Sequence, residues 1–278
     1  MDKHPVEKGI EDVVKTYELL DRIRLGRDLV IRDDQFEPEA LLDAARFARS
    51  KGIRLSLLDT GRFEPSGLEW FIRERVRFYT SDEARPREPE LARLLKACLS
   101  ARTFLAYFQN GPLQMQPGAD SVSLEALRGL TSAGMDIHIS NRAHARDSGN
   151  LAELAENAAA GRSYFVYYHL GPLTPELTGL AAAGAWIHFP DRSLNAEDAA
   201  GLAQEIARAA RQAGSRAAVY VETGLPLPVL EGLFAAGAAV LFRTPPGDRE
   251  SLLRPFEQKA RKRELPARAF YLFTTFLP

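Results

Sequence analysis

Residues 124–142 read LEALRGLTSAGMDIHISNR: a leucine-rich helix, a Gly turn, an apolar strand and a polar end. The same order returns in LTGLAAAGAWIHFPDR (177–192) and LEGLFAAGAAVLFRT (230–244). A second kind of strand alternates with these copies, in LSLLDTG (55–61), LAYFQNG (105–111), VYYHLGPL (166–173) and VYVETGLPL (219–227). Self-similarity at a regular period indicates a repeat architecture, so the repeat predicts the fold before any single residue is interpreted.

Strands and helices alternate along the repeat, and this alternation predicts a parallel sheet joined by right-handed crossovers. A Gly follows many of the helices, as a left-handed helix cap favours. Four βαβα repeats from residue 53 make eight strands, which is the number in a closed (βα)8 barrel of the TIM-barrel type. We expect those strands near residues 53–59, 76–81, 103–109, 135–140, 164–169, 185–189, 216–222 and 238–243.

The segment LVIRD (29–33) looks like a ninth strand, for which a closed eight-strand barrel has no obvious place. An open α/β solenoid accepts any number of strands, so an open or incomplete barrel is the alternative. Residues 6–25 have the apolar spacing of an amphipathic helix. We therefore expect an N-terminal capping helix within residues 1–27 and a single barrel-like repeat domain over residues 28–278.

The composition limits the kinds of partner that we expect this chain to bind. The net charge of −1 argues against nucleic acid or a membrane surface as the main partner, because both usually need a basic excess. A single cysteine allows no disulfide framework, and no segment is apolar for long enough to span a membrane or to act as a signal peptide. These features predict a cytoplasmic protein.

The two faces of each strand differ in chemistry. Aligning the first strand type on its terminal glycines predicts that a mostly apolar row faces the helices, namely Leu58, Phe108, Tyr168 and Val221. The opposite row then carries Tyr107, Tyr167 and Tyr220, followed by Asp59, Gln109, His169 and Glu222. A packed barrel lumen is usually lined by Val, Ile and Leu. The polar row therefore predicts either a functional cavity or, in an open sheet, a concave binding surface.

Sites in barrels form where the loops after the strands meet. There we expect His169, Asp59 and Glu222 to transfer protons and three arginines to bind a carboxylate or phosphate, namely Arg142, Arg192 and Arg243. Asn110, Asn141 and the tyrosines at 107, 167 and 220 complete the candidate ligand-binding set. The alternatives are that these charges pair with one another or cap helices, and that the tyrosines fill the core.

Metal and cofactor signals are weak. His138, His169 and His188 together suggest a divalent-metal site, but no H-x-H or HExxH motif supports one, so we predict no metal ligands. Dinucleotide, Walker-type and nucleophile-elbow motifs are absent too, and the cofactor stays unknown. The helix–Ala-Gly–strand rhythm is loosely similar to radical-SAM and other barrel enzymes, but one cysteine cannot supply that family's three thiolates.

The sequence thus favours binding of a small anionic ligand at the carboxyl-terminal rim, with lyase, isomerase or hydrolase chemistry. The alternative is a non-catalytic repeat scaffold that binds a peptide or protein partner through its Tyr/His/Arg-rich strand face. The apolar segment RAFYLFTTFLP (268–278) would dock within the chain or form a contact between subunits of an oligomer.

Overall fold

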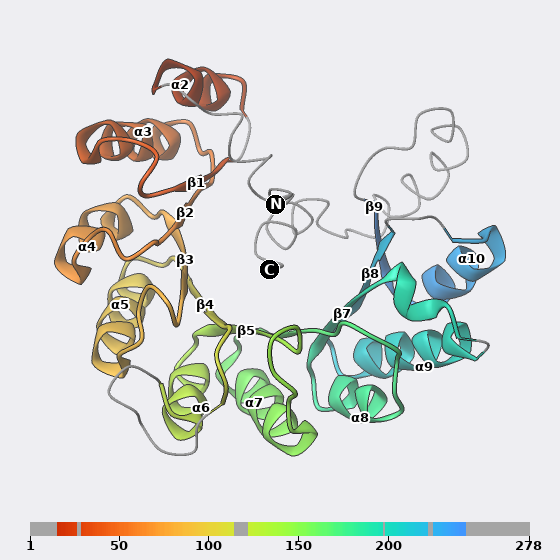
Figure 1. Cartoon of the computed structure of the whole chain (residues 1–278). Coiled ribbons are helices and arrows are strands. Elements are labelled where there is room, and N and C mark those ends of the chain that lie inside the picture. Colours follow the sequence, from red (N-terminus) through yellow and green to blue (C-terminus); the bar gives the residue numbers. More distant parts are fainter. Residues whose placement is uncertain (1–15, 27–28, 114–121, 197, 222–224, 243–278) are drawn as a thin grey trace. The chain divides into compact units, whose positions relative to one another are not determined.

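A computed structural model describes residues 16–26, 29–113, 122–196, 198–221 and 225–242 (Figure 1). The chain forms two compact units. Unit 1 runs to Ile139 and includes Asn157–Ser163, and unit 2 comprises Ser140–Glu156 and the chain from Tyr164 onward. Of the amphipathic helix expected over residues 6–25, the structure describes residues 16–25, and the rest lies outside the described residues. The apolar segment 268–278 lies wholly outside them.

Helices and strands alternate without interruption. The first part of the chain holds α2 (Thr16–Arg24), β1 (Leu29–Arg32), α3 (Pro38–Ser50), β2 (Leu55–Leu58), α4 (Pro65–Arg73), β3 (Arg77–Ser81), α5 (Glu88–Ser100), β4 (Leu105–Gln109), α6 (Leu124–Ser132), β5 (Asp136–Ser140) and α7 (Ser148–Gly161). The second part holds β6 (Phe165–Tyr168), α8 (Glu176–Ala182), β7 (Trp186–Pro190), the 3-10 helix η1 (Asp191–Leu194), α9 (Ala199–Gln212), β8 (Ala217–Val221), α10 (Leu227–Ala236) and β9 (Ala239–Phe242).

The predicted fold class is confirmed. Nine strands follow one another in one sheet in chain order, and the pairs within each unit are parallel. This is the alternating parallel architecture of the (βα)8 class, with one strand more than eight. All eight expected strands are present, and LVIRD forms the additional strand β1. No helix in the described ranges has both the length and the apolarity needed to cross a bilayer.

Local sequence explains where the helices begin and end. Proline stands in the first turn of α3, α4, α5 and α10, where its missing N–H is not needed. Ser123 caps α6 by accepting a hydrogen bond from the backbone nitrogen of Ala126 at 3.1 Å. After most helices the chain turns through a left-handed residue. Glycine fills this position at 26, 52, 134, 184, 214 and 237, whereas arginine fills it at 75, 102 and 162.

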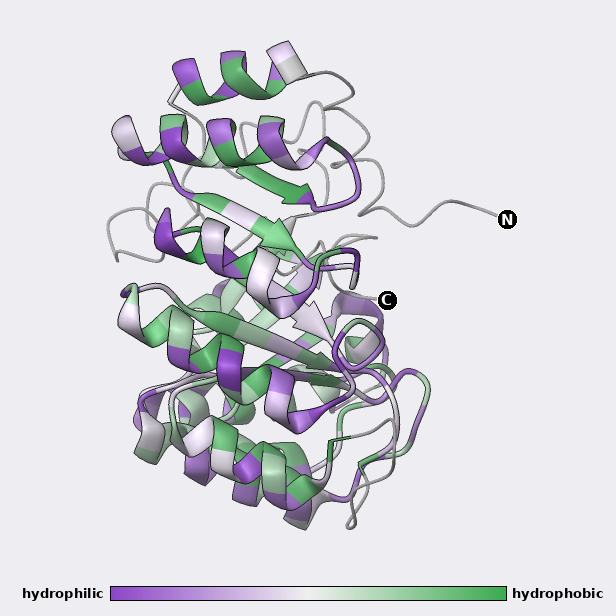
Figure 2. Cartoon of the chain, turned by 90° about the vertical axis from the view of Figure 1, so that its left-hand side faces the viewer, coloured by the Kyte–Doolittle hydropathy of each residue, from purple (hydrophilic) through white to green (hydrophobic). Residues whose placement is uncertain are grey.

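In each unit the helices lie along one face of the strands (Figure 1). Figure 2 shows hydrophilic residues on the helices and mostly hydrophobic strands beside them. We call the side under the helices the helix-covered face and the other side the helix-free face. Leu57, Phe78, Ile137 and Ile187 lie on the helix-covered face, since each is at most 1% exposed.

The strand register corrects our assignment of two tyrosines. Paired residues of parallel strands point to the same side. Tyr107 pairs with Ile137 and Tyr167 pairs with Ile187, so both tyrosines lie on the helix-covered face and not on the opposite one. They are buried between strands and helices, which places them in the core.

The helix-free face instead carries three of the four residues that we expected under the helices, whereas Val221 alternates with Val219, the partner of Phe189, and lies on the helix-covered face as predicted. Phe108 pairs with His138 in the strand register, and their stacked rings have centroids 4.3 Å apart. Tyr168 pairs with His188, and their ring centroids are 5.1 Å apart. Leu58, which pairs with Tyr79, is on this face too. The reason for the error is physical: the bulky apolar and aromatic side chains that fill one face of a strand look alike in sequence to those that fill the other.

Candidate functional site

Polar side chains at the carboxyl ends of the strands connect neighbouring loops. Asp33, Asp82 and Asn141 each come directly after an odd-numbered strand. Each accepts a backbone N–H from the loop after the next strand: Thr60 at 3.1 Å, Asn110 at 3.1 Å and Leu170 at 2.7 Å, respectively. We call these three contacts the rim braces. They give the recurrent Asp and Asn of the repeat a structural role.

Polar residues at the ends of the even-numbered strands hold their own loops. An oxygen of Asp59 accepts the N–H of Gly61 at 3.0 Å. Gln109 donates its amide to the carbonyl of Gly111 at 3.2 Å, and His169 Nε2 lies 2.8 Å from the carbonyl of Pro172. These residues occupy equivalent positions, as the repeat predicted. Asn110, expected to bind ligand, takes part in the brace of Asp82 through its backbone.

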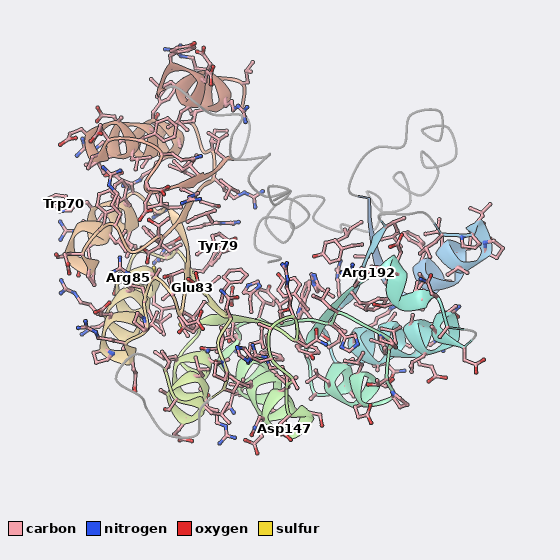
Figure 3. All side chains as sticks on the ribbon, in the orientation of Figure 1. Trp70, Tyr79, Glu83, Arg85, Asp147 and Arg192 are labelled. Carbon is pink, nitrogen blue, oxygen red and sulfur yellow. The ribbon has the colours of Figure 1, made fainter. Side chains whose placement is uncertain are left out.

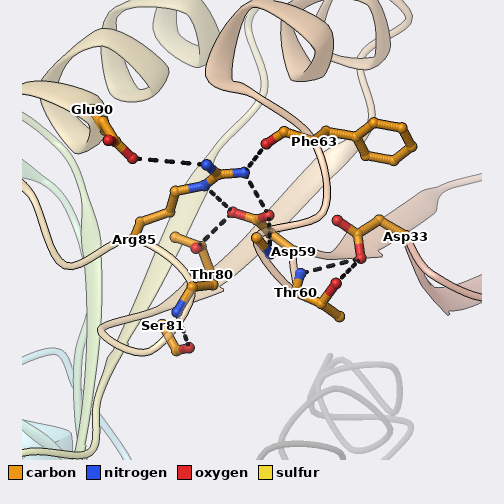
Figure 4. Close-up of polar contacts among 10 residues, drawn as sticks. Asp33, Asp59, Thr60, Phe63, Thr80, Ser81, Arg85 and Glu90 are labelled. Atoms are coloured by element: carbon orange, nitrogen blue, oxygen red, sulfur yellow. Dashed lines mark hydrogen bonds and ion pairs between the residues drawn. The ribbon is translucent and has the colours of Figure 1, made fainter.

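In unit 1, Asp59 is bound to Arg85 (Figure 4). The guanidinium donates to both carboxylate oxygens, at 2.8 and 3.0 Å, and Thr80 donates its hydroxyl to one of them at 2.8 Å. Arg85 also donates to the carbonyl of Phe63 and lies 3.7 Å from Glu90. The side chains of Asp59 and Arg85 are 0% and 5% exposed. Both oxygens of Asp59 are thus engaged, which favours a structural role over proton transfer.

Asp33 lies beside this pair and was not among the sequence candidates. One carboxylate oxygen accepts the hydroxyl and the N–H of Thr60, at 2.6 and 3.1 Å. The other, Oδ2, is buried and has no hydrogen-bond partner in the described part of the chain. Burial is the main reason that the pKa of Asp33 is raised, although the bonds from Thr60 oppose it. The acid at the end of the LVIRD segment was the available signal.

In unit 2, Asn141 and His169 are brought together. The Asn141 amide nitrogen lies 3.4 Å from His169 Nδ1 and donates to the carbonyl of Leu170 at 3.0 Å. The carbonyl of Pro172 can only accept, so the proton of the neutral imidazole lies on Nε2. His169 Nδ1 is therefore the atom that carries the lone pair, and this lone pair faces the Asn141 amide.

Two arginines flank this His at the same rim. Arg142 and Arg192 are each the second residue after an odd-numbered strand, β5 and β7. Their side chains are exposed and have no carboxylate partner among the residues that the structure describes. At the equivalent positions of unit 1 stand two acids, Asp34 and Glu83 (Figure 3 labels Glu83 and Arg192). This position is therefore acidic after β1 and β3 and basic after β5 and β7.

The helix-free face of unit 2 carries a buried polar pair. His188 Nδ1 lies 2.7 Å from the Tyr220 hydroxyl, and burial lowers the pKa of His188 to about 3. The imidazole is therefore neutral at physiological pH. Tyr220 lies on the face that we predicted, whereas Tyr107 and Tyr167 do not. Burial raises the pKa of Tyr167 to about 12 and that of Tyr107 further.

The structure does not support a metal site built from the imidazoles. His169 follows Tyr167 on the helix-covered side of β6, whereas His188 lies on the opposite face of the adjacent strand. Within the described ranges, no group of three His, Cys, Asp or Glu residues is placed to hold a metal ion. The predicted residues Glu222 and Arg243 lie outside the described residues.

No protein-family model and no curated protein matches the chain. Among solved structures, deoxyribose phosphate aldolase from Aeropyrum pernix is 13% identical with a TM-score of 0.33, over 93% of this chain and 99% of that one. An HpcH/HpaI aldolase from Desulfitobacterium hafniense DCB-2 is 11% identical with a TM-score of 0.35, over 90% and 98%. The 3-dehydroquinate dehydratase from Aquifex aeolicus VF5 is 13% identical with a TM-score of 0.34, over 63% and 82%. Similarity at this level assigns no activity.

Proposed function

We propose that the carboxyl-terminal rim of unit 2 binds a small carboxylate or phosphate anion. The observation that carries this proposal is the pair Arg142 and Arg192, two exposed guanidinium groups without carboxylate partners among the described residues. An unpaired cation attracts an anion without first having to break an ion pair. A guanidinium also presents two parallel N–H donors, which match the oxygens of a carboxylate or phosphate.

The strands bring the two arginines to opposite sides of His169. The N–H of Asn141 bonds to the carbonyl of Tyr168 at 3.3 Å, and the N–H of His169 bonds to the carbonyl of His188 at 2.7 Å. The ends of β5, β6 and β7 are therefore adjacent. Strands two apart are separated by about 10 Å. Two arginine side chains can span such a gap around a small ligand.

His169 supplies the chemistry in this proposal. Its Nδ1 lone pair is held beside the Asn141 amide, so it can accept a proton from a bound ligand or return one. Proton transfer next to a bound anion is a step shared by lyases, isomerases and hydrolases, the classes we propose. Asp59 belongs to the ion pair of unit 1 and takes no part in this site.

Binding can be tested with inorganic phosphate and malonate as probes, at constant ionic strength, by thermal unfolding and calorimetry. We expect at least one of these two anions to raise the Tm of the protein. Arg142→Ala and Arg192→Ala should each weaken binding at least tenfold, since a hydrogen bond to a charged group contributes about 1.5–3 kcal/mol. Arg208→Ala, an exposed arginine on α9, is the control for loss of one positive charge.

Two results would remove the proposal. One is the absence of any anion-dependent rise in Tm. The other is equal weakening in the Arg208→Ala control, which would show that only the net charge matters. His169→Ala should still bind a simple anion. With a substrate identified, this variant should show no turnover.

The partner-binding alternative has less support. It requires the helix-free strand face to be accessible, yet His138, Tyr168, His188 and Tyr220 are all buried. We therefore propose a small anion, and not a protein or nucleic acid, as the main partner. Location in the cytoplasm and formation of an oligomer through residues 268–278 stay predictions.

A further inference from the structure

Unit 1 has a cleft at the carboxyl ends of its helices. Asp33 and Asp59 stand at the carboxyl ends of the strands, so they lie at the opposite edge of the sheet from this cleft. The cleft has a volume of about 430 Å³ between the ends of α3, α4 and α5. Its charged lining consists of four arginines and one glutamate: Arg49, Arg73, Arg75, Arg102 and Glu69. Pockets of about 300–1,000 Å³ commonly hold small ligands. The lining therefore combines a ligand-sized space with an excess of positive charge.

The nearby acids are already neutralised. Glu69 accepts from Arg93 at 2.8 Å, and Glu74 accepts from Arg49 at 3.0 Å. Arg75 and Arg102 have no side-chain partner in the part of the chain that the structure describes.

Arg73 has an aromatic contact but no carboxylate partner in the described ranges. It lies 5.1 Å from the ring centre of the exposed Trp70, which Figure 3 labels on α4. Three of the four guanidinium groups are thus available to an anion.

Two of these arginines stand where glycine is the better residue for folding. Arg75 and Arg102 have φ angles of 61° and 56°, in the left-handed region that glycine adopts without strain. The chain places glycine at the same position after six other helices. Positive charge near a helix carboxyl end does favour the helix dipole, but that effect needs no left-handed residue. Arginine takes this position after three helices, and two of those three arginines line the cleft.

We propose that this arginine cleft binds a multiply charged phosphate compound, with pyrophosphate as its simplest form. Guanidinium groups bind phosphate oxygens through paired, charge-assisted hydrogen bonds, and several of them can share the charge of adjacent phosphates. The site lies in unit 1 and uses none of the residues of the rim site proposed for unit 2. It would serve a second ligand or a regulatory anion.

The test uses the full chain carrying Arg142→Ala and Arg192→Ala, so that pyrophosphate cannot bind through the unit 2 rim. Binding is measured by calorimetry at constant ionic strength, with thermal unfolding in parallel. In this background we expect pyrophosphate to bind and to raise the Tm. Arg75→Gly and Arg102→Gly should each weaken binding at least tenfold, and citrate at matched charge should bind at least tenfold more weakly than pyrophosphate.

Arg162→Gly is the matched control, because Arg162 has the same left-handed conformation, with φ 56°, and does not line the cleft. All three glycine variants should unfold at a higher temperature than the background, because glycine relieves the left-handed conformation. Loss of binding at 75 and 102 with binding retained at 162 would support the site. The proposal is overturned if pyrophosphate does not bind, if Arg162→Gly weakens binding equally, if the two cleft variants bind normally, or if citrate binds as tightly.

Discussion

The Asp59–Arg85 pair provides the sharpest test of how unit 1 is held together. Replacing Arg85 with Met keeps a long apolar side chain and removes the guanidinium. Asp59 would then be a fully buried carboxylate whose hydrogen-bond partners among the described residues are Thr80 and Gly61. Removing one partner of a buried ion pair costs about 3–5 kcal/mol, because the other charge stays desolvated and uncompensated. We expect Arg85→Met to lower the free energy of unfolding of unit 1 by that amount.

A double variant separates the pair from its parts. Asp59→Asn combined with Arg85→Met removes both charges, so most of the lost stability should return, because uncharged replacements of buried ion pairs are often nearly neutral. For an m-value of about 2 kcal/mol per M, the single Arg85 variant should unfold at a urea concentration roughly 2 M lower than the unmodified protein.

The two tryptophans allow each unit to be followed separately. Trp70 lies in α4 of unit 1 and Trp186 in β7 of unit 2. Urea unfolding is followed by fluorescence in a Trp186→Phe background, which reports on unit 1, and by circular dichroism for the whole chain. If Arg85→Met costs less than about 1 kcal/mol, the typical value for an exposed ion pair, Asp59 is not the desolvated carboxylate described above.

Three further predictions concern single residues. The raised pKa of Asp33 means that the folded chain binds the carboxyl proton more tightly than the unfolded chain does. The free energy of unfolding should therefore fall as the pH rises from about 4 through that pKa. Urea unfolding at several pH values measures this dependence, and Asp33→Asn should remove it. A Cβ at Gly161 would lie 2.4 Å from the Thr131 carbonyl oxygen, so Gly161→Ala should destabilise the fold by more than about 1 kcal/mol, whereas Gly179→Ala, with open space around it, should be neutral or stabilising by calorimetry. Arg75→Gly should raise the free energy of unfolding by about 1 kcal/mol through relief of its left-handed conformation, and an unchanged or lower Tm would contradict that reading.

The sequence predicted the strands well because both signals for them are local. A strand is a short apolar run, and the Gly or Pro beside it ends or begins a helix. The segment LVIRD met these criteria and forms β1. The absolute orientation of a strand is not local. Tyr107 and Phe108 are both large and buried, so alternation alone does not indicate which of them faces the helices.

The candidate site was predictable in position but not in its contacts. Repeat equivalence correctly placed Asp59, Gln109 and His169 at the ends of even-numbered strands. What they bind depends on how each loop folds back, as when the Pro172 carbonyl meets His169. Asp33 was missed for a related reason: its burial and its unpartnered oxygen arise from the loop carrying Thr60, which lies 27 residues further along the chain.

The rim braces also show how the strands are grouped. Each described brace joins an odd-numbered strand to the even-numbered strand that follows: β1 to β2, β3 to β4 and β5 to β6. Among the described residues the braces therefore group the strands into pairs that begin at β1 and not at β2. In unit 1 the boundary between β2 and β3 is crossed instead by Asp59, which accepts from Thr80 and Arg85, so a change in length by whole pairs of strands would leave the braces intact but break this buried ion pair.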